Sequence, residues 1–151
     1  MSKRLSFRGL LGDGSKETIN LHTIDGNTGY RIVKLQIMPN DPGGASTEHV
    51  LQVSKTSSAD FVVTPTTVVD FSNQVLLAAA IVNNNTNSSA YPSDSSIIFE
   101  SEIFNQDIFI VHKVENTTAS LNYYIELEQM DLSLDEATVA TLKDIRNTGT
   151  Q

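Results

Sequence analysis

The stretch LNYYIELEQM at residues 121–130 decides the fold class, because its side chains alternate between apolar and polar from Leu121 to Glu128. Odd-numbered positions carry Leu, Tyr, Ile and Leu, and even-numbered positions carry polar side chains that include Glu126 and Glu128. A period of two residues is the pattern of a β-strand with one buried and one exposed face. This stretch therefore predicts a strand whose polar face is solvated or lies at an interface.

The same alternation recurs upstream in short segments that are separated by clusters of Gly, Pro, Asn, Asp and Ser. Such punctuation is typical of strands joined by turns. The polar residues 83–96 are expected to form a long exposed loop. The expected strands are residues 4–10, 17–24, 30–38, 49–53, 61–63, 67–71, 97–104 and 107–114.

Two of the segments have apolar side chains on both faces. In residues 30–38, Val33, Leu35 and Ile37 alternate with Ile32, Lys34 and Gln36, so one face is expected to be dry and the other partly covered. Residues 75–82 are apolar throughout and contain three consecutive alanines, which leaves a central strand and a short buried helix open. The branched side chains and the short length favour the strand.

One helix is expected, at residues 134–147. Ser133 is placed as its N-cap, and Glu136 completes a capping box in which each side chain satisfies a backbone donor of the other residue. Gly149 is available to terminate the helix. A narrow apolar stripe suits docking on one surface and is the predicted interface, formed by Leu134, Val139, Leu142 and Ile145.

The number and spacing of the strands predict an all-β protein, a jelly-roll-like β-sandwich with a short C-terminal α-helix. A chain of 151 residues has the length of one ordinary domain. We expect residues 1–130 to form the sandwich, and residues 131–151 to form a helix and tail that belong to the same domain.

Composition excludes several kinds of function. The chain has no cysteine, which rules out disulfides and thiolate metal sites, and no apolar run approaches the length of a membrane span. Its net charge of −8 argues against direct nucleic-acid binding. The N-terminal cations are read as a solvated or partner-contacting arm: Lys3, Arg4, Arg8 and Lys16.

No cluster of residues points to catalysis, a cofactor or a metal. The histidines His22, His49 and His112 lie on different expected strands without the spacing of a zinc motif. Alternating glutamates such as Glu100 and Glu102 fit a half-exposed strand better than an acid and base pair. We therefore expect no enzyme. A glycan-binding sandwich stays open, and its candidate aromatic platforms are Tyr30, Tyr91, Tyr123 and Tyr124.

Residues 104–149, FNQDIFIVHKVENTTASLNYYIELEQMDLSLDEATVATLKDIRNTG, resemble the C-terminal part of small virion proteins of marine tailed bacteriophages. In these proteins a strand of the type N-Y-Y-[IL]-E-[LM]-E leads directly into an acidic-capped helix. The segment GYRIVKLQIMP at residues 29–39 similarly resembles their early strand.

This resemblance implies a non-enzymatic virion structural protein, a capsid decoration or minor capsid component. Its expected partners are capsid proteins and copies of itself in a homo-oligomer, and its expected place is the capsid exterior after synthesis in the host cytoplasm. The alternative is a receptor- or carbohydrate-binding module of the particle. The family offers no catalytic residues to match.

Overall fold

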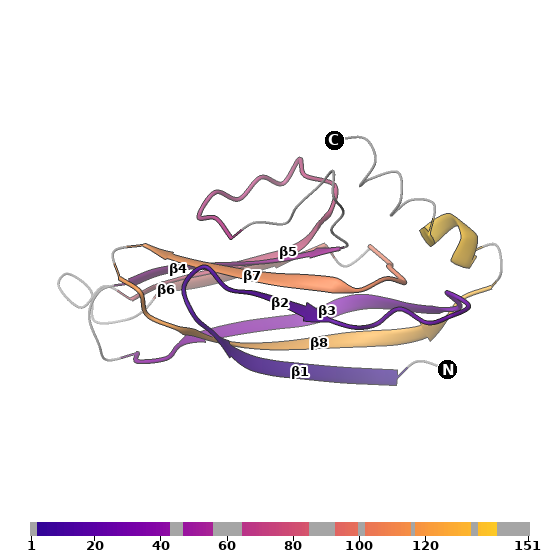
Figure 1. Cartoon of the computed structure of the whole chain (residues 1–151), viewed down its shortest axis with the longest axis horizontal. Helices are drawn as coiled ribbons and strands as arrows, with labels where there is room; N and C mark the ends of the chain where they lie inside the picture. Colours follow the sequence, from indigo (N-terminus) through magenta and orange to yellow (C-terminus); the bar gives the residue numbers. More distant parts are fainter. Residues whose placement is uncertain are drawn as a thin grey trace.

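The structure is a computed structural model and describes residues 3–42, 47–55, 65–84, 93–99, 102–115, 117–133 and 136–141. These residues form two antiparallel sheets packed face to face, with a short helix at residues 136–141 beside one end (Figure 1). No helix among them is long and apolar enough to cross a membrane. The strands are β1 Lys3–Leu11, β2 Lys16–Ile19, β3 Thr28–Pro39, β4 Thr47–Lys55, β5 Leu76–Asn84, β6 Ser93–Ile98, β7 Ile108–Glu115 and β8 Leu121–Asp131.

The strand pairing is that of an antiparallel ribbon wound into a sandwich. The three-stranded sheet has the order β1-β8-β3, and the five-stranded sheet has the order β2-β7-β4-β5-β6. Pairs β1 with β8, β2 with β7 and β4 with β5 are nested, as in a rolled ribbon that turns at β4 and β5. The nested pair that is not formed is β3 with β6, because β6 pairs with β5 instead. The expected all-β sandwich with a short helix is confirmed.

The core lies between the two sheets and consists of the side chains that each strand turns inward. In β8 these are Leu121, Tyr123, Ile125 and Leu127, as the alternation predicted. Burial of one such aliphatic side chain contributes about 1.5–3 kcal/mol. The opposite sheet supplies buried Leu51 and Val53 from β4 and Ile108 and Ile110 from β7, among others.

Residues 76–82 form a strand and not a helix: β5 lies between β4 and β6, and its side chains from Leu76 to Ala80 are buried while Ile81 is exposed. Two other expectations were wrong. Residues 67–71 are not a strand but cross the outer face of the five-stranded sheet, where Gln52 Nε2 donates to Val68 O at 3.1 Å. The loop expected at residues 83–96 ends earlier than predicted, because β6 begins at Ser93. This strand ends at Ile98, so it is shifted toward the N-terminus relative to the expected strand 97–104. Residues 61–63 lie outside the described part.

The predicted division of residues 30–38 into two faces was also wrong at one position. The pairing of β3 with β8 shifts by one residue between Ile32 and Lys34, which marks a β-bulge. The extra residue reverses the alternation, so Ile32 and Leu35 both face the core while Lys34 and Gln36 face outward. Because this segment has apolar residues at both odd and even positions, its sequence does not reveal where such a bulge lies.

The helix is capped as predicted. Ser133 Oγ accepts a hydrogen bond from Glu136 N at 3.2 Å, and Glu136 Oε1 accepts one from Ser133 N at 3.3 Å. Ala137 and Ala140 face the sandwich together with Leu132. Buried Asn105 links this helix to the sandwich, because its Nδ2 lies 2.8 Å from Thr141 Oγ1 and 3.0 Å from Gly26 O.

Candidate functional site

The outer face of the three-stranded sheet carries a regular pattern of charge. The central strand β8 contributes Glu126 and Glu128 to this face. Register places Arg4 of β1 and Arg31 of β3 on either side of Glu128, and Lys34 of β3 beside Glu126. Glu128 therefore lies between two arginines, whereas Glu126 lies between Ser6 of β1 and Lys34 of β3. We call this surface the charged face, and Arg8 beside Tyr124 completes it.

Three ion pairs form across the charged face. Arg31 Nε lies 2.9 Å from Glu128 Oε1, whereas Glu126 is shared more loosely by Arg4 at 3.8 Å and Lys34 at 3.7 Å. Exposed pairs of this kind contribute about 0–1 kcal/mol each. These three ion pairs therefore contribute little to the stability of the sheet.

The charged face has the opposite sign to the whole chain. It holds four cations and two carboxylates, a net charge of +2 by subtraction, whereas the chain has 10 Lys and Arg against 18 Asp and Glu and a net charge of −8. The N-terminal cations Arg4 and Arg8 thus belong to a strand and not to a separate arm, and they meet Arg31 and Lys34 from β3. The sequence did not reveal this cluster of cations, because the residues of β1 and β3 that form it are far apart along the chain.

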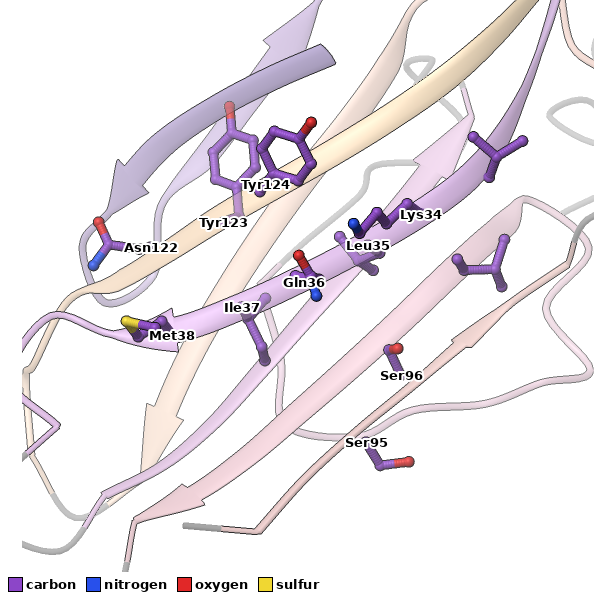
Figure 2. A pocket seen from close by; sticks show the side chains of 12 residues that line it. Lys34, Leu35, Gln36, Ile37, Met38, Ser95, Ser96, Asn122, Tyr123 and Tyr124 are labelled. Carbon is purple, nitrogen blue, oxygen red and sulfur yellow. The ribbon is translucent and has the colours of Figure 1, made fainter. Parts of the chain in front are cut away.

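A groove of about 540 Å³ adjoins the charged face where β3 and β6 lie opposite each other (Figure 2). Its walls are residues 33–38 of β3, residues 122–124 of β8, and Ser95, Ser96 and Ile98 of β6. Lys34, Gln36 and Tyr124 belong to both the groove and the outer surface of the sheet. The groove lies where the unformed β3–β6 pair of the rolled ribbon would be.

One edge of β3 is open along this groove. The edge begins at Tyr30, which forms an isolated antiparallel bridge to Phe104 with hydrogen bonds of 2.8 and 2.9 Å in the two directions. From Ile32 to Met38, β3 has β8 as its neighbour and no second strand among the described residues. An open strand edge presents backbone donors and acceptors that another strand can use.

A second polar feature lies inside the sandwich. His49 of β4 and His112 of β7 are fully buried, and His49 Nδ1 lies 2.9 Å from His112 Nε2. Burial, followed by repulsion from His112, lowers the pKa of His49 to about 4, while the nearby Asp13 carboxylate acts in the opposite direction. Burial also lowers the pKa of His112. Both rings are therefore neutral at pH 7.

The described residues contain no group of three or more His, Cys, Asp and Glu that could hold a metal ion. The three histidines are not brought together, because only His49 and His112 meet, whereas His22 is exposed and bonds to Asp107. The sequence analysis did not predict this histidine pair. The signal for it in the sequence is that each histidine stands at a position of its own strand whose side chain faces the core.

The predicted interface stripe is only partly within the described residues. Val139 is 64% exposed and faces away from the contact made by Ala137 and Ala140. Leu134, Leu142 and Ile145 lie outside the described residues. Of the candidate glycan platforms, Tyr30 and Tyr123 are buried in the core, Tyr91 lies outside, and Tyr124 alone lines the groove from the outer surface.

No protein-family model and no curated protein matches the chain. Among solved structures it is similar to Desmodium yellow mottle tymovirus, with 13% identity and a TM-score of 0.35 over 87% of this chain and 89% of that chain. It is also similar to the decameric BFDV capsid protein, with 6% identity and a TM-score of 0.15 over 84% and 100%. The fold assignment rests on the strand pairing described above and not on these two likenesses.

Proposed function

We propose that the protein is a non-enzymatic structural component of a virus particle and acts through protein–protein contacts. The observation that carries this proposal is the rolled-ribbon sandwich, an architecture used by viral capsid domains, in which the outer face of one sheet carries exposed charged side chains. The resemblance of residues 104–149 supports the finer proposal of a capsid decoration or minor capsid protein of a tailed bacteriophage.

Two surfaces are available for assembly in this proposal. The charged face would meet an acidic surface of a capsid protein or of a second copy, since the rest of the chain is strongly acidic. The helix would offer Val139, which is exposed beside the sandwich, as part of the predicted stripe. The acidic remainder of the surface suits the exterior of a particle better than contact with packaged nucleic acid.

Mass spectrometry of gradient-purified particles from the virus that encodes the chain tests this proposal. We expect the protein at a fixed copy number per particle, retained after washing in moderate salt. Its presence in the infected-cell lysate together with its absence from the particles would overturn the proposal. Val139→Asp and Leu142→Asp, compared with Val139→Ala, report whether the helix stripe is needed for incorporation.

A second candidate is a receptor- or carbohydrate-binding module, since jelly rolls also occur in lectins. The groove favours it by combining the aromatic ring of Tyr124 with the amides of Gln36 and Asn122. Screening on a glycan array would separate the two functions. Saturable binding of one glycan class, lost in Tyr124→Ala and kept in Tyr124→Phe, would support this candidate.

A further inference from the structure

We propose that the groove between β3 and β6 binds an extended segment of another protein, which adds to the open edge of β3 as a fourth strand of the β1-β8-β3 sheet. This proposal goes beyond a virion role and does not depend on it. Three features of the described residues carry it: the orientation of the β3 backbone, the unformed pair in the rolled ribbon, and the alternation of charge across the sheet.

The backbone of β3 turns hydrogen-bonding groups toward the groove, where no described strand pairs with Leu35 or Ile37. Tyr30 exchanges both hydrogen bonds with Phe104, so its N–H and C=O point away from β8. Because neighbouring residues alternate and the bulge adds one residue, Lys34, Gln36 and Met38 bond to β8. Leu35 and Ile37 therefore direct their N–H and C=O groups into the groove, which offers up to four ladder hydrogen bonds.

The strand topology indicates that the edge of β3 lacks the neighbour that a complete rolled ribbon would provide. A ribbon with the nested pairs β1–β8, β2–β7 and β4–β5 would also contain the pair β3–β6, but β6 extends the five-stranded sheet instead. The bridge between Tyr30 and Phe104 shows that this edge accepts an antiparallel neighbour. A strand supplied by another chain would continue that line along β3, between β3 and β6.

Charge defines the chemistry of the added strand. In one row of the outer face, Ser6 of β1 lies opposite Glu126 of β8, and Glu126 lies opposite Lys34 of β3, with which it forms an ion pair at 3.7 Å. The next position in this row belongs to the added strand, and opposite charges directly across a sheet are favourable. Its residue beside Lys34 is therefore acidic. Its inward positions are apolar, because they meet Leu35, Ile37 and Ile98.

A peptide fits the groove better than a glycan does. The groups at the β3 edge that no described strand pairs with are regularly spaced backbone donors and acceptors, which an added strand satisfies along its whole length. The groove side chains contain one charged group, Lys34, and its position on the outer rim matches a single acidic residue. A second copy of this chain and a glycan are treated as outcomes of the test.

The test uses a fluorescent synthetic peptide of about nine residues, a typical strand length, in which valine alternates with threonine and a central outward threonine is replaced by glutamate. Fluorescence anisotropy with the full chain is expected to show saturable binding. Amide NMR shifts on binding are expected to concentrate at Leu35, Ile37 and β6. A peptide of the same composition in scrambled order is the control and is expected not to bind.

Ile37→Pro removes one N–H that faces the groove and leaves the ladder to β8 intact, because Ile37 does not bond to β8. The matched control Ile37→Ala removes the same side chain but keeps the N–H. We expect Ile37→Pro to weaken peptide binding at least about tenfold relative to Ile37→Ala, with both variants folded by circular dichroism. Equal binding by the two variants would overturn strand addition.

Lys34 sets the preference for the acidic peptide. Wild type is expected to bind the glutamate peptide about two- to fivefold more tightly than one with lysine at that position, and Lys34→Gln is expected to abolish the difference. An unchanged preference would overturn the assigned register. The absence of binding at millimolar peptide, or amide NMR shifts that concentrate away from β3 and β6, would refute the site. A wild-type dimer that Ile37→Pro makes monomeric would show that a second copy of the chain occupies the groove. A glycan that competes with the peptide would show that the groove binds glycans.

Discussion

The imidazole rings of His49 and His112 stack inside the sandwich with their centroids 5.1 Å apart. His112 Nδ1 lies 2.9 Å from the carbonyl oxygen of Gly12, so this nitrogen carries the proton. His112 Nε2 then accepts from His49 Nδ1, and His49 Nε2 is left as a buried lone pair with no partner among the described residues. A further proton would create a buried donor without an acceptor.

The first prediction is a loss of stability in mild acid. The folded chain holds the pKa of His49 at about 4, whereas a histidine in the unfolded chain has its ordinary pKa of 6.5. Between these values the unfolded chain binds more protons, so the free energy of unfolding falls as the pH falls from 6.5 to 4. The expected loss is about 3 kcal/mol, measured from urea unfolding at several pH values.

The matched variant is His49→Asn, because the Asn amide nitrogen can keep the donor to His112 while removing the titrating ring. This variant is expected to show a markedly shallower pH dependence over the same range. Its residual slope would report His112, whose pKa is also lowered by burial. The same slope in the variant as in wild type would show that the acid sensitivity arises elsewhere.

The histidine pair also shows where sequence reasoning ended. The alternation of residues 107–114 and of residues 49–53 correctly assigned both strands. It did not reveal that β4 and β7 are neighbours, with Leu51 opposite His112, because contact between residues 63 apart depends on the long-range pairing of the sheet. The charged face was hidden for the same reason, since its rows cross three strands.

Local composition predicted the wrong structure where strand pairing outweighed intrinsic propensity. Residues 93–96 read as loop because Ser and Asp are poor strand formers, yet β6 pairs with β5 from Ala78 to Asn83. The capping box at Ser133 and Glu136 was predictable because its hydrogen bonds join residues three positions apart. Features that depend on near neighbours were therefore predicted well, and features that depend on register were not.

The second prediction concerns Gly9, whose missing side chain leaves room for the ring of Tyr123. A Cβ at this position would lie 2.9 Å from Tyr123 Cε1. Gly9→Ala is expected to destabilise the protein by about 1–3 kcal/mol, because the buried ring has to move. Gly12→Ala is the control, since its Cβ would meet only Ser15 Oγ at 3.5 Å.

The contact with Tyr123 is tested by a double variant. In Gly9→Ala/Tyr123→Leu, the clash is removed, so the combined destabilisation is expected to be smaller than that of the two single variants added together. Tyr123→Leu alone is expected to be costly, because it deletes a buried ring whose hydroxyl bonds to Glu17. Simple additivity in urea unfolding would show that the ring does not cause the cost at Gly9.

The third prediction concerns Asn105, which anchors the helix. Asn105→Asp replaces a donor to Thr141 Oγ1 and Gly26 O with an acceptor, and the new carboxylate would face the Gly26 carbonyl. Hydrogen exchange is expected to accelerate at residues 136–141 while β8 stays protected. Asn122→Asp, the same change at an exposed position of β8, is the control. Equal protection of the helix in both variants would remove Asn105 from its anchoring role.

The fourth prediction separates two ion pairs of the charged face by double-mutant cycles. Arg31 and Glu128 approach to 2.9 Å, and the side chain of Glu128 is only 19% exposed. A coupling energy of about 0.5–1 kcal/mol is therefore expected for this pair. Arg4 is 60% exposed and lies 3.8 Å from Glu126, so its coupling is expected to be below about 0.3 kcal/mol. Replacement by Gln at each position and urea unfolding measure both values.

Since about 1 M salt screens exposed charges beyond roughly 3 Å, both coupling energies are expected to decrease at that salt concentration. A larger coupling for Arg4 than for Arg31 would instead show that Glu126, held between Arg4 and Lys34, organises the face as one network.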